Sequence, residues 1–285
     1  MLIKREYYCL IAGLPDLFFD ENKPTVTGSD FREELQHQLS QPDFKLVEYL
    51  FLPFDNRNLL NVFFGQNKPF FYPGNITKHE LESQLSPENE EIQLPEYMKT
   101  FLCWMKGMDK KQADLEDKNI LTTLFFEYAL KCPNSFLQNW FRFELNLKNI
   151  FTAFNCKKYN YEPEIHLLEV EGECIVYSLL IENKLKADYF EELLPYHEEL
   201  FKIAESNRVW IEKEKAVDKI KWEYLDENTF FHFFTIEKVL AFTIKLLLIE
   251  RWMKMDKETG KKLLHKLIDE LKTNYEFPAE FSLTK

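Results

Sequence analysis

Residues 134–156, NSFLQNWFRFELNLKNIFTAFNC, decide the fold class of this chain. Asn134 or Ser135 supplies an N-cap, and apolar side chains then recur on almost every face of the turns that follow. A helix that is apolar nearly all round is buried among other helices. Residues 236–249 repeat this pattern near the C-terminal end. The sequence therefore predicts an all-α protein in which amphipathic helices surround two central ones.

Beyond residue 95 the chain contains few helix breakers, and the prolines at 133 and 163 stand where a helix would end or begin. Apolar residues recur there with helical spacing. The predicted helices span 96–107, 113–131, 134–156, 162–184, 187–207, 210–226, 233–254 and 258–273.

The first hundred residues contain eight prolines, which predicts short helices. The run Asp30-Phe-Arg-Glu33 has the character of a capping box and is expected to open a helix that ends near Ser40. Residues 45–52 and 56–64 are short apolar segments, either of which also suits a strand. The polar run from Ser83 to Gln93 suggests a linker.

Length and hydrophobic content favour one mainly helical domain over residues 1–285. The change in proline content suggests a possible subdivision into a proline-rich part, 1–94, and a long-helix part, 95–285. The fold expected is a multi-helix bundle or funnel with a shorter, proline-broken N-terminal region.

Composition excludes several function classes. The seven glycines are never closer than nine positions, so the chain has no GxGxxG, P-loop or GxSxG motif. The net charge of −12 disfavours nucleic-acid binding. No apolar run approaches the ~18 residues of a membrane span. Five scattered cysteines without a CxxC motif predict reduced, buried thiols and a cytoplasmic location.

The histidines form no recognisable metal motif. His197-Glu198 begins the HExxH pattern of zinc hydrolases, but position 201 is Phe. Glu34 and His37 have the Glu-x-x-His spacing of helical di-iron sites, which require two such pairs. The sequence therefore predicts no metal, no cofactor, no small-molecule substrate and no catalytic residue. An enzyme whose site is assembled from dispersed residues remains an alternative.

Charged and amide side chains interrupt both central helices. A buried charge must be paired or hydrogen-bonded, because leaving it bare is costly. One interpretation is a set of internal ion pairs, between Arg142 and Glu144 or between Arg251 and a Glu of a facing helix. The other is that these side chains face a groove or opening that receives a partner. The candidate residues are Arg142, Glu144, Asn146, Asn149, Lys245, Glu250 and Arg251.

Residues 162–206 concentrate the negative charge, with 12 acidic and 3 basic residues. Such a run is expected either as a solvated helical face or as an acidic docking surface for a basic partner.

Two motifs resemble known families. The run Trp140-Phe-Arg-Phe-Glu144-Leu-Asn146-Leu-Lys148-Asn149-Ile150, together with the helix from Ile236 to Arg251, resembles helices of the V-type ATPase C subunit, called d in eukaryotic enzymes. The opening Tyr7-Tyr8-Cys-Leu-Ile-Ala-Gly-Leu-Pro-Asp-Leu17 is similar to a bacterial family of unknown function that is encoded beside V-type ATPase subunits. This second match runs along nearly the whole chain.

The resemblance implies a non-catalytic socket. The C subunit is a funnel of helices with rough threefold internal symmetry that joins the central shaft to the membrane proteolipid ring and transmits torque. By resemblance, the partners are the V-type ATPase shaft subunits and that ring, and the chain lies in the cytoplasm, peripheral to the membrane. The alternative is a stand-alone helical scaffold or adaptor unrelated to the ATPase. No repeat at a fixed period is visible in the sequence.

Overall fold

The computed structural model of the chain describes residues 5–19, 24–66, 68–86, 93–105 and 115–255. Within these residues the chain forms twelve α-helices, one 3-10 helix and no strand. The prediction of an all-α protein is confirmed. The helix predicted over 258–273 lies outside the described residues.

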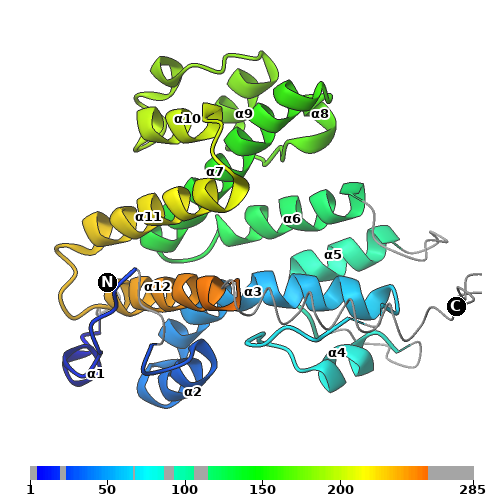
Figure 1. Cartoon of the computed structure of the whole chain (residues 1–285). Coiled ribbons are helices and arrows are strands. Elements are labelled where there is room, and N and C mark those ends of the chain that lie inside the picture. The colour runs from blue at the N-terminus through cyan, green and yellow to red at the C-terminus, as the bar shows by residue number, and fades with distance from the viewer. Residues whose placement is uncertain (1–4, 20–23, 67, 87–92, 106–114, 256–285) are drawn as a thin grey trace, which may run out of the picture.

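The helices lie in tiers that α7 connects (Figure 1). In that view α3 and α12 form a lower row above α1, α2 and α4, α6 and α11 form the row above them, and α8, α9 and α10 gather around the far end of α7. The bounds are α1 (Tyr8–Ala12), α2 (Gly28–Gln38), α3 (Gln41–Phe63), α4 (Lys78–Gln84), α5 (Glu96–Met105), α6 (Leu115–Ala129), α7 (Ser135–Tyr159), α8 (Pro163–His166), α9 (Cys174–Ile181), the 3-10 helix η1 (Ala187–Phe190), α10 (His197–Glu205), α11 (Trp210–Thr229) and α12 (Ile236–Lys254).

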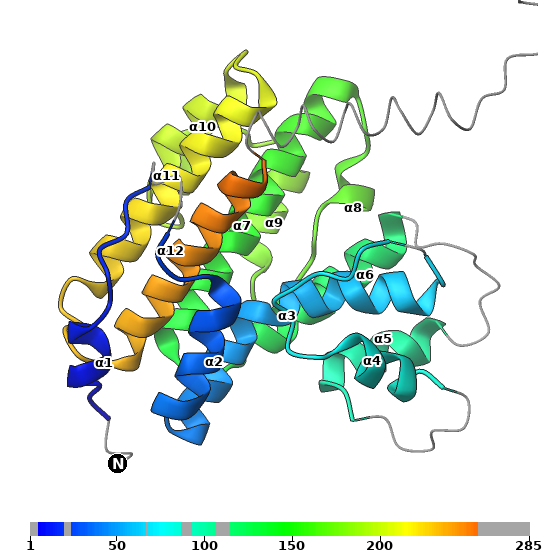
Figure 2. The same cartoon turned by 60° about the horizontal axis from the view of Figure 1, so that its bottom comes forward.

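Aromatic contacts join the rows. The rings of Phe143 on α7 and Tyr224 on α11 stack with their centroids 4.2 Å apart. The ring of Phe31 on α2 meets that of Phe242 on α12 edge-on at 4.9 Å. Figure 2 shows α7, α11 and α12 running side by side. Most of the buried apolar side chains belong to one connected core that extends from Leu10 to Leu246.

The prediction of short N-terminal helices is wrong at α3. The segments 45–52 and 56–64, which also suited strands, belong to one helix of 23 residues with Pro53 inside it. A proline within a helix removes one hydrogen bond and costs about 3 kcal/mol. Buried side chains on both sides of the proline, such as Phe51 and Leu59, each contribute about 1.5–3 kcal/mol. The free energy gained by burying these side chains therefore exceeds the cost of the proline. Local sequence patterns do not show which of the two terms is larger.

Two long helices predicted after α7 are also wrong. The segment 162–184 is divided into α8 and α9, because residues 167–173 leave the helical path. The segment 187–207 begins as η1 and continues as α10 only after Pro195 and Tyr196. The φ angle of Tyr196 is 56°, in the left-handed region. Both connections bury apolar side chains, among them Leu168 and Leu194, so each segment follows the core rather than a straight helix.

Smaller differences concern termini and thiols. Helix α2 begins at Gly28 with Thr27 as its N-cap, three residues before the expected cap at Asp30. Helix α4 extends to Gln84, into the expected linker, of which residues 87–92 lie outside the described part. The expectation of buried thiols is wrong for Cys9, Cys103 and Cys174, which are exposed, and right for Cys132 and Cys156.

Candidate functional site: polar residues inside the helical core

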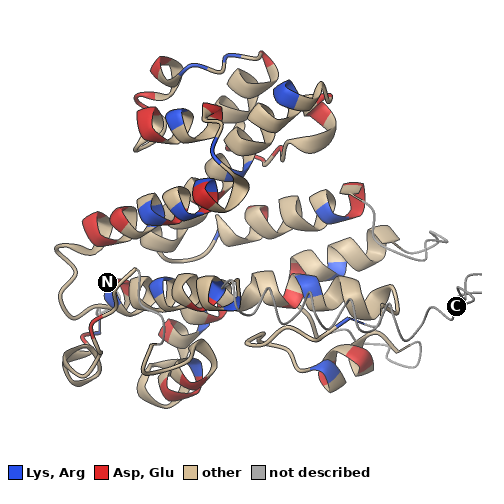
Figure 3. Cartoon of the chain, viewed as in Figure 1, with Lys and Arg blue, Asp and Glu red and all other residues tan. Residues whose placement is uncertain are grey.

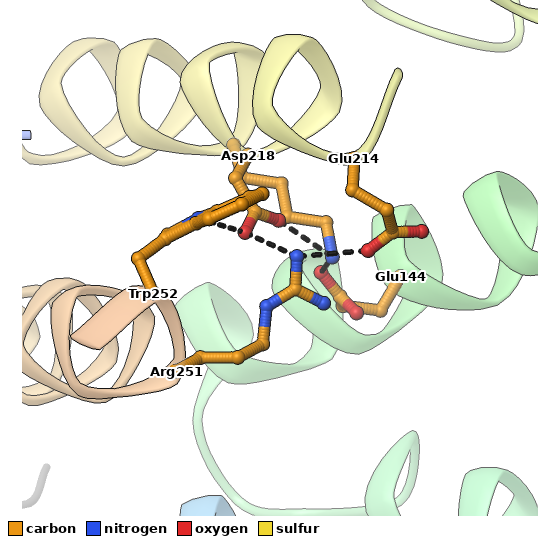
Figure 4. A network of polar contacts seen from close by, with 6 residues as sticks. Glu144, Glu214, Asp218, Arg251 and Trp252 are labelled. Carbon is orange, nitrogen blue, oxygen red and sulfur yellow. Dashed lines mark hydrogen bonds and ion pairs between the residues drawn. The ribbon is translucent and has the colours of Figure 1, made fainter. Parts of the chain in front are cut away.

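A network of charges fills the space between α7, α11 and α12 (Figure 4). The Nζ atom of Lys221 lies 2.8 Å from Oε1 of Glu144 and 3.7 Å from Oδ1 of Asp218. Nη2 of Arg251 lies 2.5 Å from Oδ2 of Asp218 and 2.8 Å from Oε2 of Glu214. The Trp252 indole donates to Asp218 Oδ2 at 2.9 Å. The buried carboxylate of Asp218 thus joins α11 to α12 through two hydrogen-bond donors, and Lys221 adds an ion pair within α11.

The electrostatics of this network follow from burial and pairing. Burial raises the pKa of Asp218, and the cations of Lys221 and Arg251 oppose that rise. Burial alone favours the neutral amine of Lys221, yet the carboxylates of Glu144 and Asp218 hold its pKa above the ordinary value. The pKa of Lys148 is lowered by burial and partly restored by Glu144. The charges therefore stabilise one another across the three helices.

The structure separates Arg142 from Glu144, so the ion pair expected between them is wrong. Residues two apart on a helix point in different directions. Nε of Arg142 instead lies 2.7 Å from Oε1 of Glu173, just before α9, and its Nη1 donates to Asn139 Oδ1 at 3.0 Å. The other expected pair, between Arg251 and a Glu of a facing helix, is confirmed by Glu214 on α11, and Arg251 also pairs with Asp218 of that helix.

Asn149 clamps the chain that follows its helix. Its Nδ2 donates to the carbonyl of Leu168 at 2.8 Å, and its Oδ1 accepts from the N–H of Leu168 at 2.9 Å. Both bonds are buried, so the amide replaces the backbone partners that a helix would have supplied at this position. The clamp lies where the helix predicted over 162–184 is interrupted, and it satisfies the backbone groups of Leu168 there. Asn146, one turn earlier, is also buried.

The two remaining candidates hold the ends of neighbouring helices. Nζ of Lys245 lies 2.5 Å from Oδ1 of Asp226 and 4.5 Å from the centroid of the Trp222 ring. Oε1 of Glu250 accepts from the N–H of Gly28, the first residue of α2, at 2.7 Å. A carboxylate at a helix N-terminus is favourable for both the free N–H groups and the helix dipole. All seven candidates therefore lie on α7 and α12, divided among several contacts rather than brought to one point.

A second clamp, which sequence reasoning missed, lies on α3. Asn58 Nδ2 donates to the carbonyl of Phe71 at 2.9 Å, and Asn58 Oδ1 accepts from the N–H of Phe71 at 2.8 Å. The Arg57 guanidinium lies 3.8 Å from the centroid of the Phe71 ring. The buried Asp55 accepts from the side chain of Asn75 at 2.7 Å and from the N–H of Ile76 at 3.1 Å.

The two clamps occupy matching positions in two similar segments. Residues 54–63 read FDNRNLLNVF and residues 145–154 read LNLKNIFTAF. In register, Asp55 matches Asn146, Asn58 matches Asn149, and a basic residue precedes each clamp. This likeness was a signal available in the sequence, although the segments do not recur at a regular period.

A hydroxyl, an imidazole and a carboxylate meet where α12 begins. Nδ1 of His232 lies 3.4 Å from Oγ1 of Thr235 and 3.6 Å from Oε2 of Glu237, and the Thr235 hydroxyl also donates to Glu237. In a catalytic triad the histidine uses one ring nitrogen for the nucleophile and the other for the acid. Here Nδ1 of His232 faces both the hydroxyl and the carboxylate. The arrangement is therefore that of polar contacts at the start of a helix, not that of a catalytic triad.

In the described part of the chain, no group of three or more His, Cys, Asp or Glu side chains is placed to hold a metal ion. Over that part, too, no helix combines the length and the hydropathy needed to cross a bilayer.

Comparison with known proteins gives a family but no activity. The model of a family described as "Protein of unknown function (DUF2764)" matches residues 4–275. An uncharacterized protein of Chlamydia muridarum is 24% identical over 139 residues, which is 48% of this chain and 51% of that relative. The matching part thus spans about half the length of the relative. No solved structure matches the chain. Neither the family nor the relative links it to the V-type ATPase. Because the family model covers nearly the whole sequence, the chain belongs to the DUF2764 family of unknown function.

Proposed function

We propose that this chain is a non-catalytic accessory or central-stalk component of a V-type ATPase, linking the rotor shaft to the membrane proteolipid ring. In this proposal it lies on the cytoplasmic side, peripheral to the membrane through its partner proteins. The resemblance to the V-type ATPase C subunit implies a helical socket with internal repeats, and the paired clamps at Asn58 and Asn149 are the observation that carries the proposal. Two helices with matching segments and the same backbone contact are expected of such a socket.

The packing suits a part that must transmit force. Buried charges tie α7, α11 and α12 together, and ring contacts join α2 to α12 and α7 to α11. Closely packed protein interiors deform little, since side chains that interdigitate leave few voids. A torque-transmitting socket needs that stiffness.

The test is reconstitution with defined partners. The tagged chain is co-expressed with the shaft and ring subunits of its host's V-type ATPase and analysed by size-exclusion chromatography. We expect co-elution with the rotor. If the chain is folded and the shaft and ring assemble without it, the proposal is wrong and a stand-alone helical scaffold or adaptor takes its place.

Two arginine variants separate assembly from folding. The Arg142 side chain is 41% exposed and pairs with a residue just before α9, whereas Arg251 is bonded to the buried Asp218. We expect Arg251→Met to lower both the melting temperature and assembly. If Arg142 faces a partner, Arg142→Met should weaken assembly at an unchanged melting temperature. Equal loss of both in the two variants would assign Arg142 a purely structural role.

A further inference from the structure

The connection between α11 and α12 exposes a row of aromatic rings. Phe230, Phe231, Phe233 and Phe234 are 67%, 81%, 64% and 37% exposed, although phenylalanine is among the residues most often buried. From Asn228 to Ile236 the chain contains no Asp, Glu, Lys or Arg. The connection lies at one end of the molecule beside α1 (Figures 1 and 2). We call residues 230–234 the Phe loop.

The Phe loop is held in place from the N-terminal side. The N–H of Tyr7 donates to the carbonyl of Phe234 at 2.7 Å. The Tyr8 ring lies 4.6 Å from the Phe234 ring, centroid to centroid. A loop that is ordered before it binds loses less conformational entropy on association. The Phe234 end of the loop is therefore anchored by the N-terminal segment.

The exposed area argues against a second copy of this chain as the occupant. Four partly exposed phenylalanines offer on the order of 500 Å². A stable interface buries ~800 Å² on each partner. Two loops meeting face to face would thus fall short, whereas a groove that encloses the loop can also contact the neighbouring ends of α11 and α12.

The acidic residues on the α10 and α11 side of the loop argue against an anionic membrane and for a basic protein rim. The carboxylates of Glu199, Glu223 and Glu227 lie around the hydroxyl of Tyr196, whose pKa is raised first by burial and then by these acids. Glu227 is on the last turn of α11, three residues before the loop. Acidic residues gather on α10 and at this end of α11 (Figure 3). The acids on α10 and α11 would repel anionic headgroups, whereas a basic rim on a partner protein would complement these acids.

We propose that the Phe loop inserts into an apolar groove with a basic rim on a partner protein. This inference rests on the proposed function, so the groove belongs to the V-type ATPase shaft or ring. The rings supply the buried centre of the contact, and the acids on α10 and α11 face its rim. Such an interface concentrates its affinity in a few central aromatic residues.

The test measures binding of the full chain to purified shaft subunits and, separately, to the purified proteolipid ring in detergent. We expect Phe231→Ser combined with Phe233→Ser to weaken binding about a hundredfold or more at an unchanged melting temperature. The matched control is Ile175→Ser on α9, which is 65% exposed and should change affinity less than about twofold. Glu199→Lys should weaken binding severalfold, more at low salt than at high salt.

Three results would overturn the inference alone. The first is unchanged affinity of the loop variant for a rotor part that the wild-type chain binds. The second is loop-dependent binding to phosphatidylcholine vesicles, with or without phosphatidylglycerol, while rotor binding stays unchanged; that result would assign the loop to a membrane. The third is a dimer of the isolated chain that the loop variant abolishes. If the folded wild-type chain binds neither rotor part, both this inference and the proposed function fail.

Discussion

The clamps on α3 and α7 use the same amide in different surroundings. Asn58 holds Phe71 through two partly buried hydrogen bonds, and Asn149 holds Leu168 through two buried ones. The residue three positions earlier is the acid Asp55 on α3 and the neutral Asn146 on α7. Directly before the matching segments, α3 has Pro53 and α7 has Glu144, which pairs with Lys221. The contact is shared, while charge and burial make each copy respond differently.

Removing the cation that anchors α7 should have the largest effect, and α3 has no counterpart to it. Lys221→Met would leave Glu144 and Asp218 without their shared partner, and breaking a buried ion pair typically costs 3–5 kcal/mol. We expect the free energy of unfolding to fall by about 5 kcal/mol in urea denaturation. The exposed Lys202→Met on α10 is the control, expected to stay within about 1 kcal/mol. A similar small loss for both would show that the network does not join the helices.

Removing each clamp compares the two copies directly. Asn149→Ala leaves the buried N–H and carbonyl of Leu168 without partners, and each such group costs about 1–3 kcal/mol. We expect a loss of about 4 kcal/mol for Asn149→Ala and about 2 kcal/mol for Asn58→Ala, because the partner Phe71 is only partly buried while Leu168 is buried. Asn155→Ala, an exposed substitution on α7, is the matched control. Equal losses at the two clamps would mean that burial does not distinguish them.

Asp55, three residues before the α3 clamp, should make the stability contribution of this clamp depend on pH, unlike that of the α7 clamp. Burial raises the pKa of Asp55 from 3.8 to about 6, against the hydrogen bonds from Ile76 and Asn75. The folded state therefore binds this proton more tightly than the unfolded chain, and the stabilising contribution of the group is lost as pH rises through about 6.

This effect is measured as a difference between proteins. The free energy of unfolding of Asp55→Asn minus that of wild type should rise by about 2 kcal/mol between about pH 4.5 and pH 7.5. Asn149→Ala should give a difference that does not vary with pH. A flat difference for Asp55→Asn would contradict the raised pKa.

The smallest effect concerns the helices that follow the clamps. Helix α4 begins with a full capping box, in which Thr77 and Glu80 satisfy each other's backbone N–H groups, whereas Glu173 before α9 makes no side-chain cap. Thr77→Ala should therefore lower the free energy of unfolding by about 1 kcal/mol. The exposed Ser178→Ala on α9 should change it by less than about 0.5 kcal/mol. Urea denaturation of both variants measures these changes. An equal loss of unfolding free energy in the two variants would contradict the prediction.

Sequence reasoning succeeded where a feature depends on neighbouring residues. The start of α7 at Asn134, its buried face and the bounds of α11 and α12 to within a few residues follow from capping and helical spacing, which are local. The same reasoning selected Arg251 and expected its acidic partner on a facing helix. It did not select Asp218, Lys221 or Asn58, because a polar residue on a polar helix face carries no sign of what it will contact.

The sequence by itself determined that this protein is a set of helices built around two apolar ones, since period and helix breakers act over a few residues. Only the tertiary structure decided that α3 continues through Pro53, that residues 167–173 leave the helix, and which charges pair. In each case a contact between distant segments outweighed a local preference: burial on both sides of the proline, the amide of Asn149 on Leu168, and the carboxylate of Asp218 between two cations. Such contacts exist only once the helices have packed, which is why local pattern cannot reveal them.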